Sequence, residues 1–399
     1  MKSLAYALLL ILIACRPIQA MDRIEILGWW GPDSKTGQQA FDDMAKAGFT
    51  ATTVAGDFEE KGKGLDMCQK AGIRGLLYTD GDEYADTAAA LDKMEKLAKA
   101  YRKHPALMGY LVRDEPANYE QILVIGLAAA RIRAIDTKHI IFANMLPGPE
   151  FWTPYEQNIE KYISIAKPDL LSYDRYSLLP NATAKDNYFQ NMEVIRRLAI
   201  RHSIPFMNIF LSVPHGPYRD PSEADLRWQV NTSLAYGAKL LCYFTYVTPP
   251  PDNPNYVGWG PAIIFYDGKH TPRYEIVSRI NAETNKLSPT LARLKSTAVC
   301  HVPAIPGVET DTLAGKPITA ISGGEFLIGF FTSPNGEGYA MVVNNDLKSS
   351  AQAKLEVASA TRVEWCDQNT GKWSRAQLQG LAWTIELGPG GARLLRFGR

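Results

Sequence analysis

The sequence contains few cysteines and histidines and no excess of charge of either sign. Five Cys and six His are spread over 399 residues, and no two cysteines form a CxxC pair, so a structural zinc site is not expected. Lys and Arg number 43 against 42 Asp and Glu, for a formal net charge of +1. A chain with so little net charge has no strong electrostatic attraction for nucleic acid or for an anionic membrane, and neither is expected as a partner.

Long apolar runs are also missing, except at the amino terminus. Lys2 precedes an apolar run from Leu4 to Ala14, which is too short to span a bilayer and is typical of a signal peptide. Leu12-Ile13-Ala14-Cys15 resembles a bacterial lipobox, which predicts cleavage before Cys15 and a lipid on its thiol. Cleavage after Ala20 is the alternative. We therefore expect residues 1–20 to be a signal peptide and the protein to be exported, as a periplasmic or outer-membrane lipoprotein or in secreted form. Membrane contact would occur only through the lipid.

Four cysteines remain beyond this segment. Cys68 and Cys242 lie in a predicted helix and strand, and we expect buried free thiols there. Cys300 and Cys366 share the C-terminal region, where export permits a disulfide. Their spacing leaves open whether they are bridged.

Eight short apolar runs recur between residues 22 and 296, about 25–36 residues apart, the length of one strand-plus-helix unit. They are Ile24–Gly31, Phe49–Gly56, Arg74–Gly81, Leu107–Glu115, His139–Leu146, Asp169–Ser177, Pro205–Val213 and Lys239–Val247. Helical patterns lie between them, at Thr87–Arg102, Asn118–Ile135, Asn187–His202 and Ser222–Tyr236. The alternation predicts an α/β fold, a closed (β/α)₈ TIM barrel. An open doubly wound sheet is disfavoured because no GxGxxG follows the first run, and no cofactor is expected.

The C-terminal region, residues 297–399, has a different pattern. Strand-like runs follow one another at short intervals, with Gly- and Asn-rich turns between them: Phe326–Thr332, Tyr339–Asn344, Thr361–Trp365 and Ala392–Phe397. This pattern predicts a small antiparallel β-sandwich. Pro303 and Pro306 are predicted to mark the linker between the two domains.

Catalytic groups of a TIM barrel lie at the carboxyl ends of its strands. The carboxylates near these ends are Asp57, then Asp80, Asp82 and Glu83, then Asp114 and Glu115, and finally Asp174. Predicted strands five, seven and eight end without one. Only His215 among the histidines follows a strand closely, and no HxH opens the first strand, which disfavours a metal-dependent amidohydrolase. GxSxG and GxxxxGK[ST] are absent as well.

The fourth strand carries the strongest local signal, Gly109-Tyr110-Leu111-Val112-Arg113-Asp114-Glu115-Pro116. Pro116 biases Glu115 toward extended backbone, so the carboxylate is expected to be held rigidly at the strand end, as a general acid requires. Alternation along the strand would then turn Arg113 and Glu115 inward and Asp114 toward the helices. The competing interpretation is an ion pair with Arg113 together with a helix cap.

This segment resembles the Asp-Glu-Pro ending of strand four in clan A glycoside hydrolase barrels, those of the family 42 type in particular. Arg227–Val230 and Ser233–Lys239, leading into Tyr243–Tyr246, are similar to the seventh helix and eighth strand of that group. The resemblance implies that Glu115 is the acid/base residue. The nucleophile of that clan is a glutamate ending strand seven, whereas Phe206–Val213 contains no carboxylate.

Two other groups are candidates for completing the site. Adjacent Asp114 and Glu115 are similar to the pair in N-acetylhexosaminidases of families 20 and 123, which implies that Asp114 orients a substrate acetamido group as nucleophile. Alternatively, Asp174 in Leu171–Tyr176 is the base or nucleophile. Carboxyl separations of about 5–5.5 Å and about 6.5–9.5 Å distinguish retention from inversion. The structural alternative for Asp174 is a pair with Arg113 or Arg175, and the sequence leaves the choice open.

Aromatic and polar residues near the strand ends are candidates for substrate binding. They are Trp29 and Trp30 as a sugar-stacking platform, with Arg113, Asn144, Tyr176 and Tyr246 as polar contacts, and a rim formed by Thr248–Gly260. We therefore expect a glycoside hydrolase that cleaves an oligo- or polysaccharide. The alternative is a non-catalytic carbohydrate-binding barrel that has lost its nucleophile.

Overall fold

The first domain is a closed parallel barrel of eight strands in chain order, with β8 paired to β1. The computed structural model describes residues 21–79, 87–148, 154–179, 187–359 and 362–398. The barrel strands are β1 (Glu25–Trp29), β2 (Ala51–Val54), β3 (Arg74–Tyr78), β4 (Leu107–Asp114), β5 (Ile140–Met145), β6 (Leu171–Asp174), β7 (Phe206–Leu211) and β8 (Leu240–Phe244). All eight predicted runs form these strands, so the predicted TIM barrel is confirmed.

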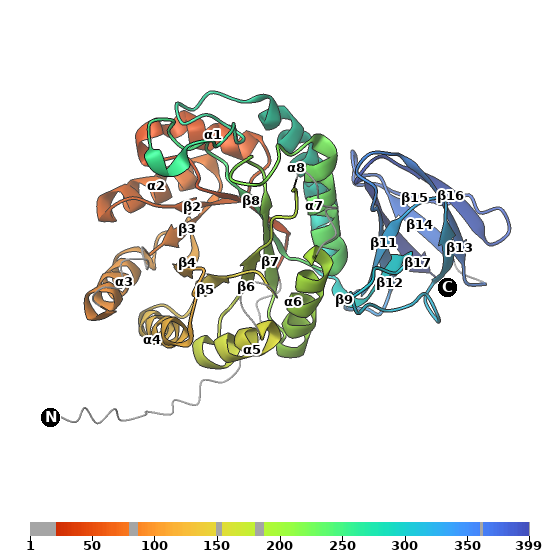
Figure 1. The fold of residues 1–399 in the computed structure, drawn as a ribbon, viewed down its shortest axis with the longest axis horizontal. Coiled ribbons are helices and arrows are strands. Elements are labelled where there is room, and N and C mark those ends of the chain that lie inside the picture. Colours follow the sequence, from red (N-terminus) through yellow and green to blue (C-terminus); the bar gives the residue numbers. More distant parts are fainter. Residues whose placement is uncertain (1–20, 80–86, 149–153, 180–186, 360–361, 399) are drawn as a thin grey trace.

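Helices surround the strands (Figure 1). They are α1 (Gln38–Lys46), α2 (Phe58–Ala71), α3 (Thr87–Tyr101), α4 (Tyr119–Ile135), α5 (Tyr155–Ala166), α6 (Tyr188–His202), α7 (Glu223–Tyr236) and α8 (Pro272–Leu291), with short 3₁₀ turns η1 (Ser34–Thr36) and η2 (Pro254–Tyr256). Asp57 forms a capping box with Glu60 at the start of α2, since each side chain accepts a hydrogen bond from the other's backbone N–H. The carboxylate after β2 is thus used as a helix cap.

The barrel interior is a packed core. Its buried apolar side chains are Leu27, Trp29, Ala51, Leu76, Met108, Leu111, Phe142, Leu170, Met207, Ile209, Leu240 and Cys242. At the amino-terminal end of the strands, buried Glu25 accepts hydrogen bonds from Arg23 (3.0 Å) and Thr50 (2.6 Å) and pairs with Arg74 at 2.5 Å. The charged groups at this end of the barrel are thus paired with one another.

The second domain consists of two antiparallel sheets. One contains β10 (Ile318–Ser322), β13 (Ala351–Val357) and β16 (Ala382–Leu387); the other contains β9 (Lys295–Val302), β11 (Phe326–Thr332), β12 (Gly338–Asn344), β14 (Arg362–Cys366), β15 (Trp373–Arg375) and β17 (Ala392–Gly398). Buried and exposed residues alternate along β13, as expected for a strand with one face on a core. The predicted β-sandwich is confirmed, and Cys300 and Cys366 are free buried thiols, as are Cys68 and Cys242.

Only Ala292–Leu294 connects the two domains, because α8 ends at Leu291 and β9 begins at Lys295. Pro303 and Pro306 follow β9 and therefore lie inside the second domain. The predicted proline-marked linker is wrong, since a strand of the sandwich precedes both prolines. Among the described residues, no helix is both long enough and apolar enough to cross a membrane.

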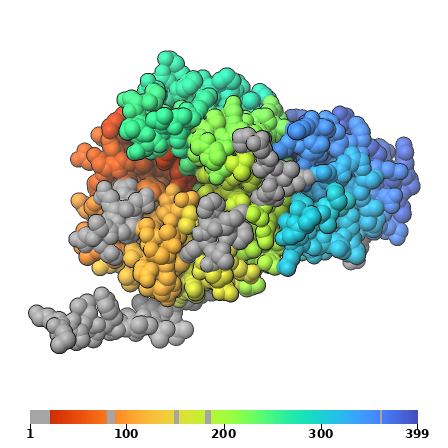
Figure 2. Space-filling view, viewed as in Figure 1, coloured from red at the N-terminus to blue at the C-terminus, as the bar shows by residue number. Residues whose placement is uncertain are grey.

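Helix α7 joins the barrel to the sandwich and is buried on nearly all sides. Trp228 donates to Asn345 (2.7 Å), and the Tyr236 hydroxyl lies 2.9 Å from His301. Gly329 of β11 is pressed against the helix so closely that a Cβ there would lie 1.8 Å from the Ala235 carbonyl oxygen. Figures 1 and 2 show the sandwich packed directly against the α7 side of the barrel.

Candidate active site

A β-bulge determines which residues of β4 face the mouth, meaning the carboxyl end of the barrel. Along the β4–β5 ladder, Leu111 pairs with Phe142, but Arg113 pairs with the next residue, Ala143, so that Val112 is an extra residue on β4. The shift brings Asp114 opposite Asn144. The expectation that Asp114 points toward the helices is therefore wrong, because it assumes uninterrupted alternation.

The same bulge changes the side of β4 on which Arg113 lies. Arg113 takes the register position of Ala143, whose side chain packs in the outer core between strands and helices. The expected inward orientation of Arg113 is therefore wrong. Arg113 is 9% exposed, and its role as a substrate contact stays a prediction.

Glu115 directly follows β4 and is exposed to solvent. Its backbone is left-handed, with φ of 42°, while its N–H still donates to the Asn144 carbonyl at 2.9 Å. The extended backbone expected before Pro116 is therefore not adopted. Helix α4 then begins only at Tyr119, after an Asn118 cap.

Positive φ angles outside glycine single out two positions at the mouth. Five such residues occur in the described chain, and Lys167, Asn187 and Ser203 among them lie at helix ends. The other two, Trp30 and Glu115, directly follow β1 and β4. A left-handed backbone is costly for residues of this size, and such strain concentrates at functional sites.

Asn144 links the two aspartates of the mouth. Its side-chain nitrogen donates to Asp114 at 2.9 Å and to Asp174 at 2.8 Å, and its side-chain oxygen accepts from Ser172 at 2.8 Å. The Ser172 bond fixes which end of the amide faces the carboxylates. Asn144 is 2% exposed, so it positions carboxylates and is not the open hydroxyl contact that the sequence suggests.

Asp174 is a buried carboxyl group of the mouth with a strongly perturbed pKa. It is 5% exposed, and the Asn144 side chain donates to it at 2.8 Å. Burial raises the pKa of Asp174 well above its ordinary value, and the nearby charges of Glu115 and Asp114 raise it further, whereas the Asn144 hydrogen bond opposes the shift. The pair Glu115–Asp174 therefore holds a proton at a pH where an isolated aspartate would have lost it.

A cluster of aromatic rings, here called the aromatic wall, lies beside these carboxylates. Its members are Trp30, Tyr176, His215, Tyr218, Phe244, Tyr256 and Trp259. Trp259 stacks on Trp30 at 5.7 Å and on His215 at 4.3 Å, and Tyr176 stacks on Phe244 at 5.2 Å. The pKa of Tyr176 is raised by burial and then by the charges of Asp174, Asp114 and Glu115, so the wall and the carboxylates share one electrostatic environment.

Two of the expected aromatic contacts are core residues instead. Trp29 is 4% exposed and packs in the barrel interior, 6.4 Å from the Tyr78 ring. Tyr246 is fully buried against Phe49, at 5.1 Å, in the outer core. Neither ring is available to a sugar in the mouth, whereas Trp30 and Tyr176 are partly exposed.

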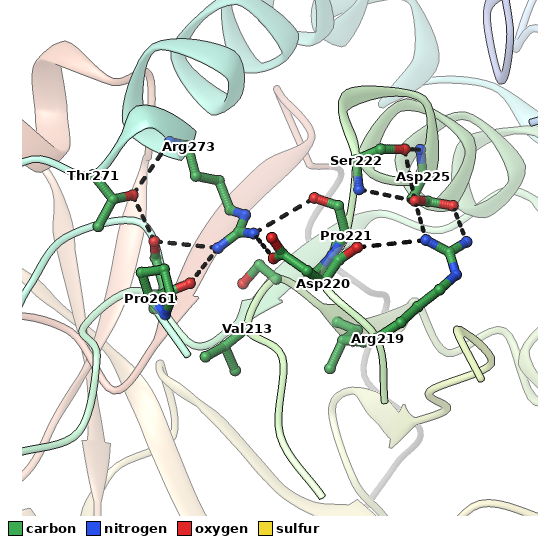
Figure 3. Close-up of polar contacts among 12 residues, drawn as sticks. Val213, Arg219, Asp220, Pro221, Ser222, Asp225, Pro261, Thr271 and Arg273 are labelled. Carbon is green, nitrogen blue, oxygen red and sulfur yellow. Dashed lines mark hydrogen bonds and ion pairs between the residues drawn. The ribbon is translucent and has the colours of Figure 1, made fainter. Parts of the chain in front are cut away.

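Buried polar contacts hold together the two loops that supply much of the wall (Figure 3). Arg273 bonds to the carbonyls of Pro261 and Ala262 in the β8–α8 loop and to Asp220 and Pro221 in the β7–α7 loop. Arg219, on the second loop, forms two bonds of 2.6 Å with Asp225. These bonds restrict the loops that carry His215 and Trp259 before any ligand binds.

The other carboxylates expected at the mouth are Asp57 and the three acidic residues that follow β3. Asp57 caps α2, and Asp80, Asp82 and Glu83 lie outside the described residues. Within the described part of the chain, no group of three or more His, Cys, Asp or Glu side chains is arranged to hold a metal ion.

Comparisons with known proteins identify the fold. No protein-family model matches the chain, and no curated protein sequence matches it. The β-galactosidase of Bacillus circulans sp. alkalophilus is similar in structure, with a TM-score of 0.67 at 11% identity over 94% of this chain and 99% of that one.

Two further β-galactosidases share the barrel. That of the psychrophilic Marinomonas ef1 has a TM-score of 0.53 at 11% identity, over 66% of this chain and 60% of that chain. That of Halorubrum lacusprofundi also has a TM-score of 0.53, at 13% identity over 66% of this chain and 58% of that one. This chain therefore spans about three-fifths of those two enzymes, and the likeness is one of fold.

Proposed function

We propose that the protein is a glycoside hydrolase in which Glu115 donates a proton to the oxygen of the scissile glycosidic bond. The observation that carries the proposal is the carboxyl cluster at the mouth, in which Asn144 joins Asp114 and Asp174 at 2.9 and 2.8 Å, beside Glu115 and the partly exposed aromatic wall. Aromatic faces suit the CH faces of sugar rings, and a protonated carboxyl group suits an alkoxide leaving group. The β-galactosidase fold of the neighbours supports the same reaction class by analogy.

The burial of Asp174 favours a particular role for this residue. Asp174 is 5% exposed, and Asn144 donates to it at 2.8 Å. Burial and the charge of Glu115 raise its pKa, so that it holds a proton that an isolated aspartate would lose. A nucleophile has to be ionised and open to the sugar, so Asp174 fits better as a buried proton-holding neighbour of Glu115.

A second candidate mechanism uses the substrate's own acetamido group. It is favoured by Asp114, which the bulge turns into the mouth and whose Oδ1 is fixed by Asn144. Asp114 would then orient the acetamido group beside the proton donor. In that case Asp114→Ala cripples turnover, thiazoline inhibitors bind, and substrates without the N-acetyl group do not react.

A non-catalytic carbohydrate-binding barrel is the alternative function. It is favoured by β7, whose inward-facing Met207 and Ile209 provide no carboxylate. In a binding protein, Trp259→Ala would weaken oligosaccharide binding about tenfold or more, as expected from removing an aromatic binding face. Glu115→Gln would then leave binding unchanged, and no hydrolysis would be measured in either protein.

Export is proposed on the sequence alone. Lys2, the apolar run and Cys15 predict a lipid-anchored protein. Cys15→Ser should abolish lipid attachment and release the protein from the membrane fraction. A wild-type protein without lipid would favour cleavage after Ala20.

The proposed activity is tested with a panel of 4-nitrophenyl glycosides and the corresponding oligosaccharides, beginning with β-galactosides and β-N-acetylglucosaminides. Glu115→Gln should lower turnover of the oligosaccharide by about 10²-fold or more, the range of general acid catalysis. Glu120→Gln is the matched control, because Glu120 is an exposed residue in the first turn of α4. Wild-type turnover in the Glu115 variant would contradict the assignment.

A further inference from the structure

The β7 side of the mouth offers no carboxylate opposite the Glu115–Asp174 pair. Between Phe206 and Arg219 the chain contains no acidic residue, and Asp220, which follows, bonds to Arg273. Ser212 is also committed, because its hydroxyl donates to the Thr245 carbonyl at 3.0 Å. A hydrolytic site that uses water directly needs a group that accepts a proton from it, and on the β7 side such a group has to be of another residue type.

His215 is placed to be that group. It lies in the loop after β7, and its Nδ1 is 3.1 Å from the Val213 carbonyl oxygen. A carbonyl only accepts hydrogen bonds, so the neutral ring carries its hydrogen on Nδ1 and keeps the lone pair of Nε2. Within the part of the chain that the structure describes, no group forms a hydrogen bond with Nε2.

The imidazole is held firmly in one orientation. Trp259 stacks on its face at 4.3 Å with 22° between the planes, and Tyr218 and Phe244 pack at 5.1 and 5.5 Å. Burial lowers the pKa of His215, and the facing titratable groups are the phenols of Tyr176 and Tyr218, whose pKa values burial raises. The ring is therefore neutral at pH 7 and able to accept a proton.

Tyr176 connects His215 to the carboxylates. The Tyr176 ring meets His215 edge-on at 5.7 Å, and the charges of Asp174, Asp114 and Glu115 act on the same phenol. The barrel strands run in the order β4, β5, β6 and β7, so β6, which Tyr176 follows, lies between the strand that precedes Glu115 and the strand that precedes His215. A sugar bound at the mouth would then have Glu115 on the β4 side and His215 on the β7 side.

We propose that His215 is a second catalytic residue, the general base that activates water for a single displacement. This inference rests on the proposed function of Glu115 as proton donor. The water oxygen bonds to the anomeric carbon while the bond to the glycosidic oxygen breaks, and the electron pair stays on the leaving oxygen. Glu115 donates its proton to that oxygen, and Nε2 takes one proton from the water. Solvent exchange then restores both residues, and the anomeric configuration is inverted.

Two measurements on the full chain test this role. The first follows the anomer released by the wild type by NMR, using whichever 4-nitrophenyl glycoside of the panel is cleaved. We expect the inverted anomer to appear first. Retention, including retention confined to acetamido sugars, would overturn the assignment without any variant having to fold.

The second measurement compares His215→Asn with His270→Asn. His270 lies in the β8–α8 loop, is exposed, stacks on Tyr274 and pairs with Asp43, outside the wall. We expect His215→Asn to lower kcat about 10²-fold or more with little change in KM, and His270→Asn to leave both unchanged. Added imidazole should partly restore His215→Ala.

The failures of the two proposals are distinguishable. Full turnover in the His215 variants, combined with loss of turnover in Glu115→Gln, would overturn the role of His215 and leave Glu115 as the acid. Full turnover in Glu115→Gln would instead overturn the proposed function itself.

Discussion

The carboxyl group of Asp174 is buried close enough to Glu115 for the charge of Glu115 to raise its pKa, although the two residues belong to strands separated by β5. Asp174 is buried and Glu115 is exposed, so one member of the pair is shielded from water while the other is open to it. Two coupled acids of this kind titrate as a unit. The proton that the pair retains is the one that the proposed reaction uses.

Asp174 makes the folded state less stable as the pH rises. Its folded-state pKa is raised, so its contribution to the free energy of unfolding is fully present below its unfolded pKa and is lost as pH rises through the folded value. Asp174→Asn keeps the shape of the side chain but cannot ionise, so the variant does not lose this stability as the pH rises. The variant should therefore gain stability relative to wild type as the pH is raised from 4 to 8. The gain in the free energy of unfolding should be at most about 1.4 kcal/mol per pH unit, over the range between the unfolded and folded pKa values of Asp174.

Urea unfolding at several pH values checks this prediction. Ser172→Ala is the control, since it alters the same cluster without removing a titrating group. A stability difference between Asp174→Asn and wild type that does not change with pH would mean that Asp174 is not the perturbed group.

Arg273 positions the aromatic wall through bonds to both of its loops. A lysine cannot reach Pro261, Ala262 and Asp220 together, so Arg273→Lys should lower the free energy of unfolding by about 1–3 kcal/mol. It should also raise KM for an oligosaccharide with little effect on kcat. Arg279→Lys is the control, because Arg279 pairs with Glu223 at the surface. Equal effects in both variants would argue against a positioning role.

Glu25 at the opposite end of the barrel should affect stability alone. Glu25→Gln weakens the bonds to Arg23 and Arg74, and the free energy of unfolding should fall by about 1.5–3 kcal/mol. The kcat of the folded protein should stay at the wild-type value. Denaturant unfolding and active-site titration measure the two effects separately, and a change in kcat would show that the two ends of the barrel are coupled.

The fold can be predicted from the sequence because its signals are local and repeat. Each barrel strand is a short apolar run bounded by turn residues, and the helices show apolar residues repeating every three to four positions. The predicted ranges of β4 and α4 therefore lie within one residue of the observed ends. The linker prediction fails because β9, which enters the sandwich, contains polar residues such as Lys295 and Ser296 and shows no apolar run at its start.

The site can be predicted only in part. Glu115 and Asp174 stand out from their positions after strands, but their contact depends on a neighbour relationship that only the folded barrel creates. The orientation of Asp114 depends on the bulge at Val112, which leaves no signature in the residue types of β4. Rules that assume regular alternation must fail at such a position.

The aromatic wall is hard to predict for a related reason. Trp30 and Trp259 are far apart in sequence and meet only because the β8–α8 loop folds back over β1. His215 and Tyr218 do carry a signal in the sequence, since both follow β7 closely. The predictions for Trp29 and Tyr246 are wrong because the sequence pattern does not reveal whether a side chain packs in the barrel interior, packs in the outer core or lies open at the mouth.

The dependence of Glu115→Gln on the leaving group is the sharpest test of the proposed acid. A general acid matters when the departing oxygen needs a proton, and it matters little for a 2,4-dinitrophenyl group, which leaves as a stable anion. If Glu115 is the proton donor, Glu115→Gln should lose about 10²-fold or more in kcat/KM on an alkyl glycoside or oligosaccharide and less than about tenfold on the matching 2,4-dinitrophenyl glycoside. Equal losses on both substrates would contradict the role of Glu115 as proton donor.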